Sequence, residues 1–382
     1  MTSLYVHIPF CVRKCAYCVF ESYPDRLDRA EEYIDRVLGE ARKRRREYGA
    51  FSCYSMYLGG GTPSLLTPGQ LNRLCGELLD MFPPEKGAEI TLEANPGTVT
   101  AELLPAAVRL GFNRISIGVQ AKQDRLLKLL GRIHTFPEAL RAVDMARQAG
   151  IENINCDVMC CLPGQTEDEL AETLTGVMEA GARHVSCYSL ILEEGTALYK
   201  RVQSGELSLP DEEAERRQLR RAARTLESRG FERYEISNFA QKGYESRHNL
   251  VYWERGEYLG LGCSAHSFMR GERFDNPRFS RYMAGEDGLD RETVGRGAAL
   301  EEEILLGTRL AKGIDVGHIR GEYGDPAADG LLNCAGRLKG LVVLENGRLK
   351  LTEEGFFVHN AVVLELAAAV QETGPDTQRR NG

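Results

Sequence analysis

The chain has 382 residues, of which 42% are apolar and 27% are charged, and its formal net charge is −8. This composition is typical of a globular protein and excludes a disordered chain, and the acidic balance argues against nucleic-acid binding. No apolar run reaches the roughly 20 residues that a membrane-spanning helix requires. Met1 leads directly into a strand-like segment, so no signal peptide and no transmembrane segment are predicted.

Eleven cysteines, an odd number, are present in the chain. In a long chain without a signal peptide, this number favours a reducing, cytoplasmic compartment over a framework of disulfides. Most of the cysteines are scattered through apolar segments, where they are expected to fill the core.

The first 190 residues alternate strand and helix patterns. Strand-like runs are predicted over residues 3–8, 55–58, 89–94, 114–119, 153–159 and 184–190. Helical patterns separate them, over residues 27–46, 68–81, 101–110, 137–149 and 166–180. This alternation implies right-handed crossovers and a parallel sheet, which could be an open doubly wound sheet or a partial barrel.

Polar residues stand late in several of these strands or directly after them. Gly59-Gly60-Gly61-Thr62 follows the second strand, and Glu93 and Asn95 end the third. Gln120 ends the fourth strand, and Asp157 lies late in the fifth. In parallel α/β folds the active site forms where the strands end. Because the polar groups would converge on one mouth, their positions favour a barrel over a flat sheet.

Three cysteines follow the first strand. Cys11, Cys15 and Cys18 have the spacing C-x3-C-x2-C, with no fourth cysteine close behind. Three thiolates on one loop can hold three irons of a cubane cluster and leave the fourth iron open to a small molecule. The alternative is three buried, inert cysteines, but neighbouring basic residues favour reactive thiolates.

The pattern changes after residue 207. A charged helix over residues 210–229 precedes a strand at 232–236 and a loop-rich stretch to about residue 296. A helix at 299–310, a hairpin around Asn346-Gly347 and a last helix then suggest a small winged-helix-like cap. The predicted organisation is a core at 1–207, a connecting segment at 208–297, a C-terminal domain at 298–370 and a disordered tail at 371–382.

Longer strings in the chain resemble a known family. They are YVHIPFC at 5–11, GGGTPS at 59–64, EANP at 93–96 and LPGQT at 162–166. Together with the cysteine spacing, they resemble the oxygen-independent coproporphyrinogen III oxidase-like group of the radical S-adenosylmethionine superfamily. The resemblance implies an α/β fold, a partial (β/α)6 TIM-like barrel with a C-terminal helical, winged-helix-like cap domain.

The resemblance also implies a [4Fe-4S] cluster and S-adenosyl-L-methionine as cofactors. Cys11, Cys15 and Cys18 would bind three irons, and the amino and carboxylate groups of S-adenosylmethionine would bind the fourth. An electron from the cluster would then cleave the sulfonium to methionine and a 5′-deoxyadenosyl radical. The residues that match S-adenosylmethionine contacts are Tyr5, Gly60, Gly61, Thr62, Glu93, Gln120, Arg132 and Asp157. Each also has a plainer interpretation, such as a turn for the glycines, a helix cap for Asp157 or a surface charge for Arg132. No catalytic residue is assigned.

Two features separate the branches of this group. The oxidase carries an N-terminal extension and a fourth cysteine two residues after the third. This sequence begins close to the first strand and has Phe20 at the position of that fourth cysteine. The motif His248-Asn249-Leu250-Val251-Tyr252-Trp253 resembles the H-N-x-x-Y-W motif of the haem chaperone HemW family. There the histidine is implicated in haem binding, and aromatic rings offer apolar faces to a macrocycle.

Alternatives to this haem assignment stay open. His248 could be a loop histidine that caps backbone groups, and Trp253 a core anchor; His266 is a second candidate ligand. The first function predicted is a haem chaperone that delivers haem to membrane-bound respiratory acceptors. The second is coproporphyrinogen III dehydrogenase, and a third is a radical enzyme that acts on another tetrapyrrole. Whether the protein is an enzyme, and whether it forms a homodimer, are left open.

Overall fold

A computed structural model describes residues 2–286 and 290–372 of the chain. Most of the predicted disordered tail, residues 373–382, lies outside the described residues. The chain divides into two compact units. Unit 1 comprises Met1–Glu232, Ser237–His248 and Glu257–Arg291, and unit 2 comprises Arg233–Ile236, Asn249–Gly256 and Glu292–Gly382.

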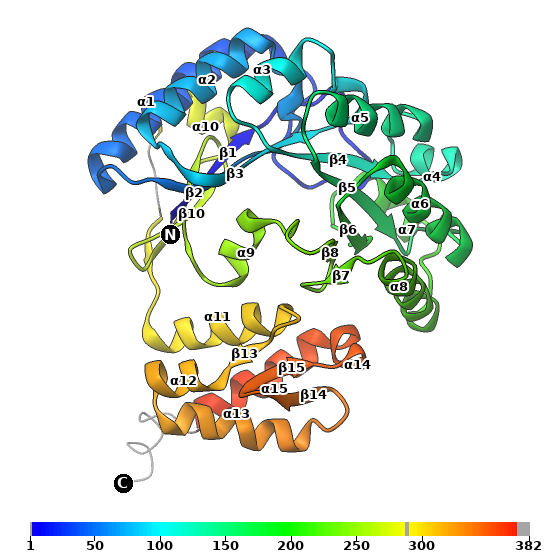
Figure 1. The fold of residues 1–382 in the computed structure, drawn as a ribbon, viewed down its shortest axis with the longest axis vertical. Helices are drawn as coiled ribbons and strands as arrows, with labels where there is room; N and C mark the ends of the chain where they lie inside the picture. Colours follow the sequence, from blue (N-terminus) through cyan, green and yellow to red (C-terminus); the bar gives the residue numbers. More distant parts are fainter. Residues whose placement is uncertain (1, 287–289, 373–382) are drawn as a thin grey trace. The chain divides into compact units, whose positions relative to one another are not determined.

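Unit 1 is built on a curved, mainly parallel sheet (Figure 1). Its six predicted strands are present as β1 (Thr2–Ile8), β2 (Cys53–Gly60), β3 (Pro84–Ala94), β4 (Arg114–Gln120), β5 (Asn153–Cys160) and β6 (His184–Ser189). Each pairs in parallel with the next along the chain. Because all six run the same way, the loops that follow them lie at one edge of the sheet.

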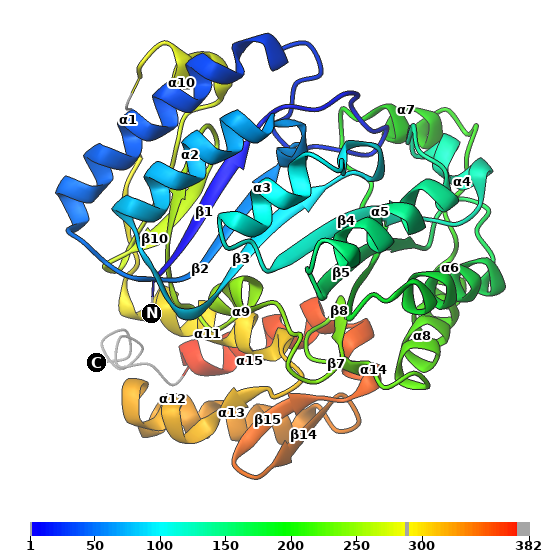
Figure 2. The same cartoon turned by 45° about the horizontal axis from the view of Figure 1, so that its top comes forward.

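Helices cover the convex face of this sheet, as Figures 1 and 2 show. They are α1 (Ala30–Tyr48), α2 (Pro68–Met81), α3 (Leu103–Arg109), α5 (Phe136–Gln148), α6 (Glu167–Ala180) and α8 (Glu212–Glu227). Capping boxes at Thr67, Thr135 and Thr166 fix where α2, α5 and α6 begin. Their apolar faces and the outward side chains of the strands form two large buried clusters. The predicted partial (β/α)6 barrel is therefore confirmed.

The stretch predicted to be rich in loops holds several further elements. They are β8 (Asn238–Ala240), α9 (Arg247–Trp253), β9 (Glu257–Leu261), β10 (His266–Met269), β11 (Glu272–Asp275) and α10 (Phe279–Met283). The strand predicted at 232–236 is present over its first two residues as β7 (Glu232–Arg233). β9 pairs in parallel with β1, and β10 and β11 extend the sheet beyond it. At the other side, β8 pairs antiparallel with β6.

The prediction of a loop-rich stretch was wrong because the strands in it are only three to five residues long, too short for a clear alternating pattern. Residues 257–291 belong to unit 1, although they were predicted to lie in a connecting segment. The H-N-x-x-Y-W motif, predicted in a loop, lies on the short helix α9.

Unit 2 combines helices with a three-stranded antiparallel sheet in the order β13-β15-β14. Its elements are α11 (Arg296–Arg309), β13 (Ile314–Asp315), α12 (Val316–Tyr323), α13 (Asp325–Arg337), β14 (Val342–Glu345), β15 (Arg348–Leu351), α14 (Glu353–Phe357) and α15 (His359–Glu372). Asn346 and Gly347 both adopt positive φ, 52° and 76°, as a two-residue hairpin turn of type I′ requires. The predicted helix, hairpin and helix are confirmed. None of the described helices is long and apolar enough to span a bilayer.

Candidate functional site

The loop after β1 brings the three predicted cluster ligands to the edge where the strands end. Cys11, Cys15 and Cys18 are partly exposed, whereas the other eight cysteines are buried. Burial raises the pKa of the Cys18 thiol, and the charge of Lys14 opposes this shift. No three acidic, His or Cys side chains of the described residues are grouped closely enough for one metal ion. A cubane cluster does not need such a group, because each thiolate binds a different iron.

The cysteine loop is held at both ends by backbone contacts. Phe10 and Tyr23 form a β-bridge, in which the Tyr23 N–H donates to the Pro9 carbonyl at 2.7 Å. At mid-loop, the Ala16 N–H donates to the Leu130 carbonyl at 2.9 Å. These bonds fix the loop at the sheet edge, where all three cysteines line one cavity.

Beside the loop lies an open cavity of about 140 Å³. Its wall combines the three cysteines with residues from the ends of β2 to β6. The predicted site residues among them are Gly60, Gly61, Glu93, Gln120, Arg132 and Asp157. Tyr5 and Thr62 are not on this wall. The Tyr5 hydroxyl bonds His7 Nδ1 at 3.1 Å, and the Thr62 hydroxyl donates to Cys11 Sγ at 3.5 Å.

Glu93 accepts two hydrogen bonds at the cavity wall. The Tyr57 hydroxyl donates to Oε1 at 2.6 Å, and the Gly60 N–H donates to Oε2 at 3.0 Å. The pKa of this carboxyl is raised to about 7, mainly by burial and in smaller part by the nearby Asp157, against the lowering effect of the bonds from Tyr57 and Gly60. Glu93 is therefore a carboxylate whose charge a cationic ligand would stabilise.

The glycines after β2 are required by close packing as well as by the cavity. A Cβ at Gly61 would lie 2.6 Å from the Phe10 carbonyl oxygen and 2.8 Å from that of Ile8. Gly60 has a φ of +109°, and its Cβ would lie 2.5 Å from the His7 ring. Only glycine fits at positions 60 and 61, because the end of β2 packs directly against the start of the cysteine loop.

Gln120 and Asp157 reach the cavity from adjacent strands. Gln120 has a φ of +67° at a register shift between β4 and β5, and its Oε1 accepts from the Tyr188 hydroxyl at 3.2 Å. Such backbone strain is typical of functional sites. Asp157 accepts from Ser116 at 3.2 Å and from Asn155 at 2.8 Å, and burial raises its pKa.

Arg132 connects the cysteine loop to the sheet. Its guanidinium donates to Cys15 Sγ at 3.5 Å, to the Gly118 carbonyl at 2.7 Å and to Asn95 Oδ1. The Asn95 amide in turn donates to the Thr62 hydroxyl at 2.7 Å. Asn95 was not among the predicted site residues, although its position after β3 in the EANP string was a usable signal.

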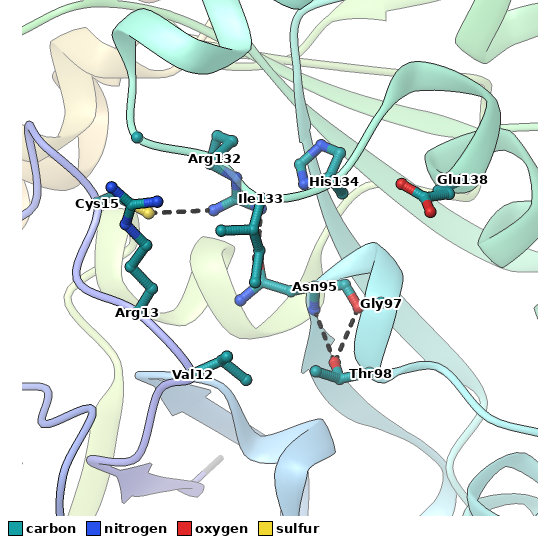
Figure 3. Close-up of a pocket in the computed structure, with 11 residues that line it drawn as sticks. Val12, Arg13, Cys15, Asn95, Gly97, Thr98, Arg132, Ile133, His134 and Glu138 are labelled. Atoms are coloured by element: carbon teal, nitrogen blue, oxygen red, sulfur yellow. Dashed lines mark hydrogen bonds between the residues drawn. The ribbon is translucent and has the colours of Figure 1, made fainter.

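A second cavity, of about 240 Å³, adjoins the first at the cysteine loop (Figure 3). It shares four residues with the first cavity, which are Arg13, Cys15, Asn95 and Arg132. In Figure 3 Arg132 lies between Cys15 and Asn95, and Val12 and Ile133 form apolar parts of the wall. The sequence did not predict this space.

None of the residues predicted for haem binding is in the lining of either cavity. His248 is 1% exposed and stacks on Tyr57 at 5.0 Å between ring centroids. Its Nδ1 lies 2.8 Å from the Ser55 hydroxyl, and burial lowers the pKa of this imidazole to about 3.

Tyr252 and Trp253 are only partly buried and are grouped with unit 2. The Arg309 guanidinium lies 4.3 Å from the centroid of the Trp253 ring. The Trp253 Nε1 is buried and has no hydrogen-bond partner among the described residues.

Comparison with known proteins supports the resemblance. The family model for the radical SAM superfamily matches residues 5–175, and that for the HemN C-terminal domain matches residues 296–358. "Heme chaperone HemW" of Bacillus subtilis (strain 168) is 34% identical over 95% of this chain and 98% of its own. The protein of the same name from Haemophilus influenzae is 38% identical over 76% of this chain and 78% of its own.

Among solved structures, coproporphyrinogen III oxidase (HemN) from Escherichia coli superposes with a TM-score of 0.82 at 23% identity. The match covers 97% of this chain and 89% of that one, and it supports the fold. Identity over almost the whole length of the relatives, on this fold and with this cysteine loop, shows that the chain belongs to the HemW family of radical SAM proteins.

Proposed function

We propose that this protein is a haem chaperone that binds haem and passes it to an acceptor protein. The observation that carries the proposal is 34% identity to "Heme chaperone HemW" over 98% of that relative's length. Phe20 agrees with it, because the oxidase branch would place a further cysteine there. The proposal includes an acceptor in a respiratory membrane. It also includes a cytoplasmic setting, which the eleven free cysteines support because thiols stay reduced there.

The first cavity fits the cofactors that the family implies. Cys11, Cys15 and Cys18 would hold three irons, since all three are partly exposed on one anchored loop. Arg132 would stabilise the thiolate of Cys15, to which it already donates. When bound, the cluster and S-adenosylmethionine would supply one-electron chemistry at the open iron.

The polar residues of the wall suit the parts of S-adenosylmethionine. The Glu93 carboxylate would accept from the ammonium group, and Asp157 from the ribose hydroxyls. Gln120 is held toward the cavity by its strained backbone and the Tyr188 hydroxyl. We therefore include these three residues, with Gly60, Gly61 and Arg132, in the cofactor site. Tyr5 and Thr62 would act through His7 and Cys11.

Coproporphyrinogen III dehydrogenase is the second candidate. The fold favours it, because the match to the oxidase extends over 97% of this chain. The two functions differ in what the purified protein does. We expect about one haem to bind per chain, and we expect no product from coproporphyrinogen III when the reconstituted protein is supplied with reductant and S-adenosylmethionine under anaerobic conditions. Product formation at an intact cluster would favour the enzyme instead.

Binding of S-adenosylmethionine should depend on pH through Glu93. The carboxylate must be ionised to accept from the ammonium group, and its pKa in the folded protein is about 7. Affinity should therefore rise about tenfold between about pH 6 and about pH 8, as the ionised fraction does. Calorimetric titration of the reconstituted protein at a series of pH values measures this. Glu93→Gln should bind weakly at every pH, whereas Glu169→Gln, on α6, should follow the wild type. A pH-independent wild type would contradict the role given to Glu93.

The same shift affects the unliganded fold. Because the folded state holds the Glu93 proton more tightly than the unfolded chain does, this group's contribution to stability is present below pH 4.5 and is lost as the pH rises through about 7. Bound S-adenosylmethionine would offset the loss by providing a cation.

A further inference from the structure

Lys14 lies within the cysteine loop, directly before Cys15. Its ammonium group donates two hydrogen bonds, to the Phe20 carbonyl and to the Ser22 hydroxyl at 3.0 Å. Both acceptors follow Cys18 in the chain, so the lysine side chain joins the middle of the loop to the segment that leaves it. Lys14 therefore closes the part of the loop that carries its last two cysteines.

No carboxylate neutralises the charge of Lys14. Both of its acceptors are neutral oxygens, and within the part of the chain that the structure describes no ion pair includes this lysine. The nearest acid along the chain, Glu21, has other partners. Its Oε1 accepts from the Tyr23 hydroxyl at 2.5 Å and from the Phe279 N–H at 3.2 Å. Lys14 therefore brings an uncompensated positive charge to the loop.

This charge acts on the third cysteine of the loop. Burial raises the pKa of the Cys18 thiol, whereas the charge of Lys14 and a backbone hydrogen bond from Phe20 lower it. Phe20 is thus in contact with both side chains, because its carbonyl accepts from Lys14. The lysine favours negative charge on this sulfur by its own charge, and it also holds the residue whose backbone has the same effect.

The sulfurs of the other two cysteines have donors from outside the loop. The Thr62 hydroxyl donates to Cys11 Sγ and the Arg132 guanidinium donates to Cys15 Sγ, both at 3.5 Å. The third sulfur depends on the loop's own lysine and backbone. Each of the three sulfurs therefore has a polar group of the protein that favours its charged form.

Hydrogen bonds to the sulfurs and the net charge around an iron-sulfur cluster set its reduction potential. A cluster that accepts an electron gains a negative charge, so a fixed cation beside it stabilises the reduced form more than the oxidised form. A lysine that only closed the loop would need its hydrogen bonds and not its charge. The two roles can therefore be separated by substitutions that keep one and remove the other.

We propose, resting on the cluster site proposed above, that Lys14 is a positioning residue for the iron-sulfur cluster. It closes the cysteine loop onto residues 20–22, and its charge raises the reduction potential of the cluster. Lys14 acts through Cys18 and is not itself a ligand. An external one-electron reductant would then reduce the cluster more readily than if the loop carried a neutral side chain at this position.

The test is a redox titration of the reconstituted full-length protein with titanium(III) citrate, followed by electron paramagnetic resonance of the reduced cluster. Lys14→Met keeps the length of the side chain but removes its charge and both hydrogen bonds. At a given ambient potential the ratio of reduced to oxidised cluster should fall about tenfold, which is a shift of about 59 mV to more negative potential for one electron.

Two further variants separate charge from hydrogen bonding. Lys14→Gln is neutral but can still donate to the Phe20 carbonyl, so it should show most of the shift. Lys14→Arg keeps the charge and should stay close to the wild type. The matched control is Lys86→Met, which makes the same change of charge. Lys86 is exposed near the start of β3, at the opposite edge of the sheet from the cysteine loop, and this variant should titrate as the wild type.

The outcomes separate this proposal from the cluster site on which it rests. If the wild type assembles no cluster, both are wrong. If the wild type holds four irons and Lys14→Met keeps the wild-type potential, the role of Lys14 is overturned while the cluster site stands. If Lys14→Met cannot hold four irons, the other two variants decide. A more negative potential in Lys14→Gln than in Lys14→Arg supports the role of the charge, and equal potentials overturn it.

Discussion

Replacing Cys15 with serine should abolish the iron-sulfur cluster. Serine removes the thiolate that one iron needs and the sulfur to which the Arg132 guanidinium donates at 3.5 Å. After anaerobic reconstitution, iron content should fall from about four per chain to near zero. The visible absorbance of the cluster should disappear with it, and binding of S-adenosylmethionine should be lost because the open iron is one of its anchors.

The control for this variant is Cys334→Ser, in unit 2. Cys334 is fully buried and donates to the Glu365 carbonyl at 3.4 Å, a bond that serine can also make. The Cys334→Ser protein should keep its full iron content. A Cys15→Ser protein that still assembled a cluster with four irons would exclude the three-cysteine loop as its ligand set.

His248→Ala should destabilise the protein by about 2–4 kcal/mol, since it leaves a cavity and an unpaired partner in the core. The imidazole is 1% exposed, stacks on Tyr57 and bonds the Ser55 hydroxyl at 2.8 Å. Urea unfolding, followed by circular dichroism, measures the loss.

Ser55→Ala isolates one part of this effect. It removes the hydrogen bond to His248 and also the bond from Ser55 to the Ser3 hydroxyl at 2.8 Å, but it keeps the aromatic stack. The expected cost is about 1–2 kcal/mol. If His248→Ala were as stable as the wild type and had lost haem, the histidine of the motif would be a ligand and not a core residue.

The barrel and the cofactor cavity were predictable from local patterns. Six apolar strands and the helices between them have clear periodicity, and capping residues such as Thr166 mark helix starts. Because parallel strands end at one edge, Glu93, Gln120 and Asp157 could be placed together without any structure. The chemistry of the cysteine loop followed from its spacing.

The environment of each histidine was not predictable, because burial depends on residues distant in sequence. His248 is covered by Ser55 and Tyr57, about 190 positions earlier. The short strand β9 has little pattern of its own and becomes a strand by pairing with β1. The second cavity lies between three loops, and the packing of one loop against another leaves no periodic pattern in the sequence.

The position of β1 in the sheet has a consequence for how the protein is made. β1 comprises Thr2–Ile8, yet one of its two neighbours, β9, comprises Glu257–Leu261. During synthesis the strand that carries the cysteine loop therefore keeps one unsatisfied side until about two-thirds of the chain has left the ribosome. The Tyr33 bridge to Cys263 forms equally late. The cysteine loop would then reach its final backbone setting only after β9 has been translated, although its three cysteines emerge first.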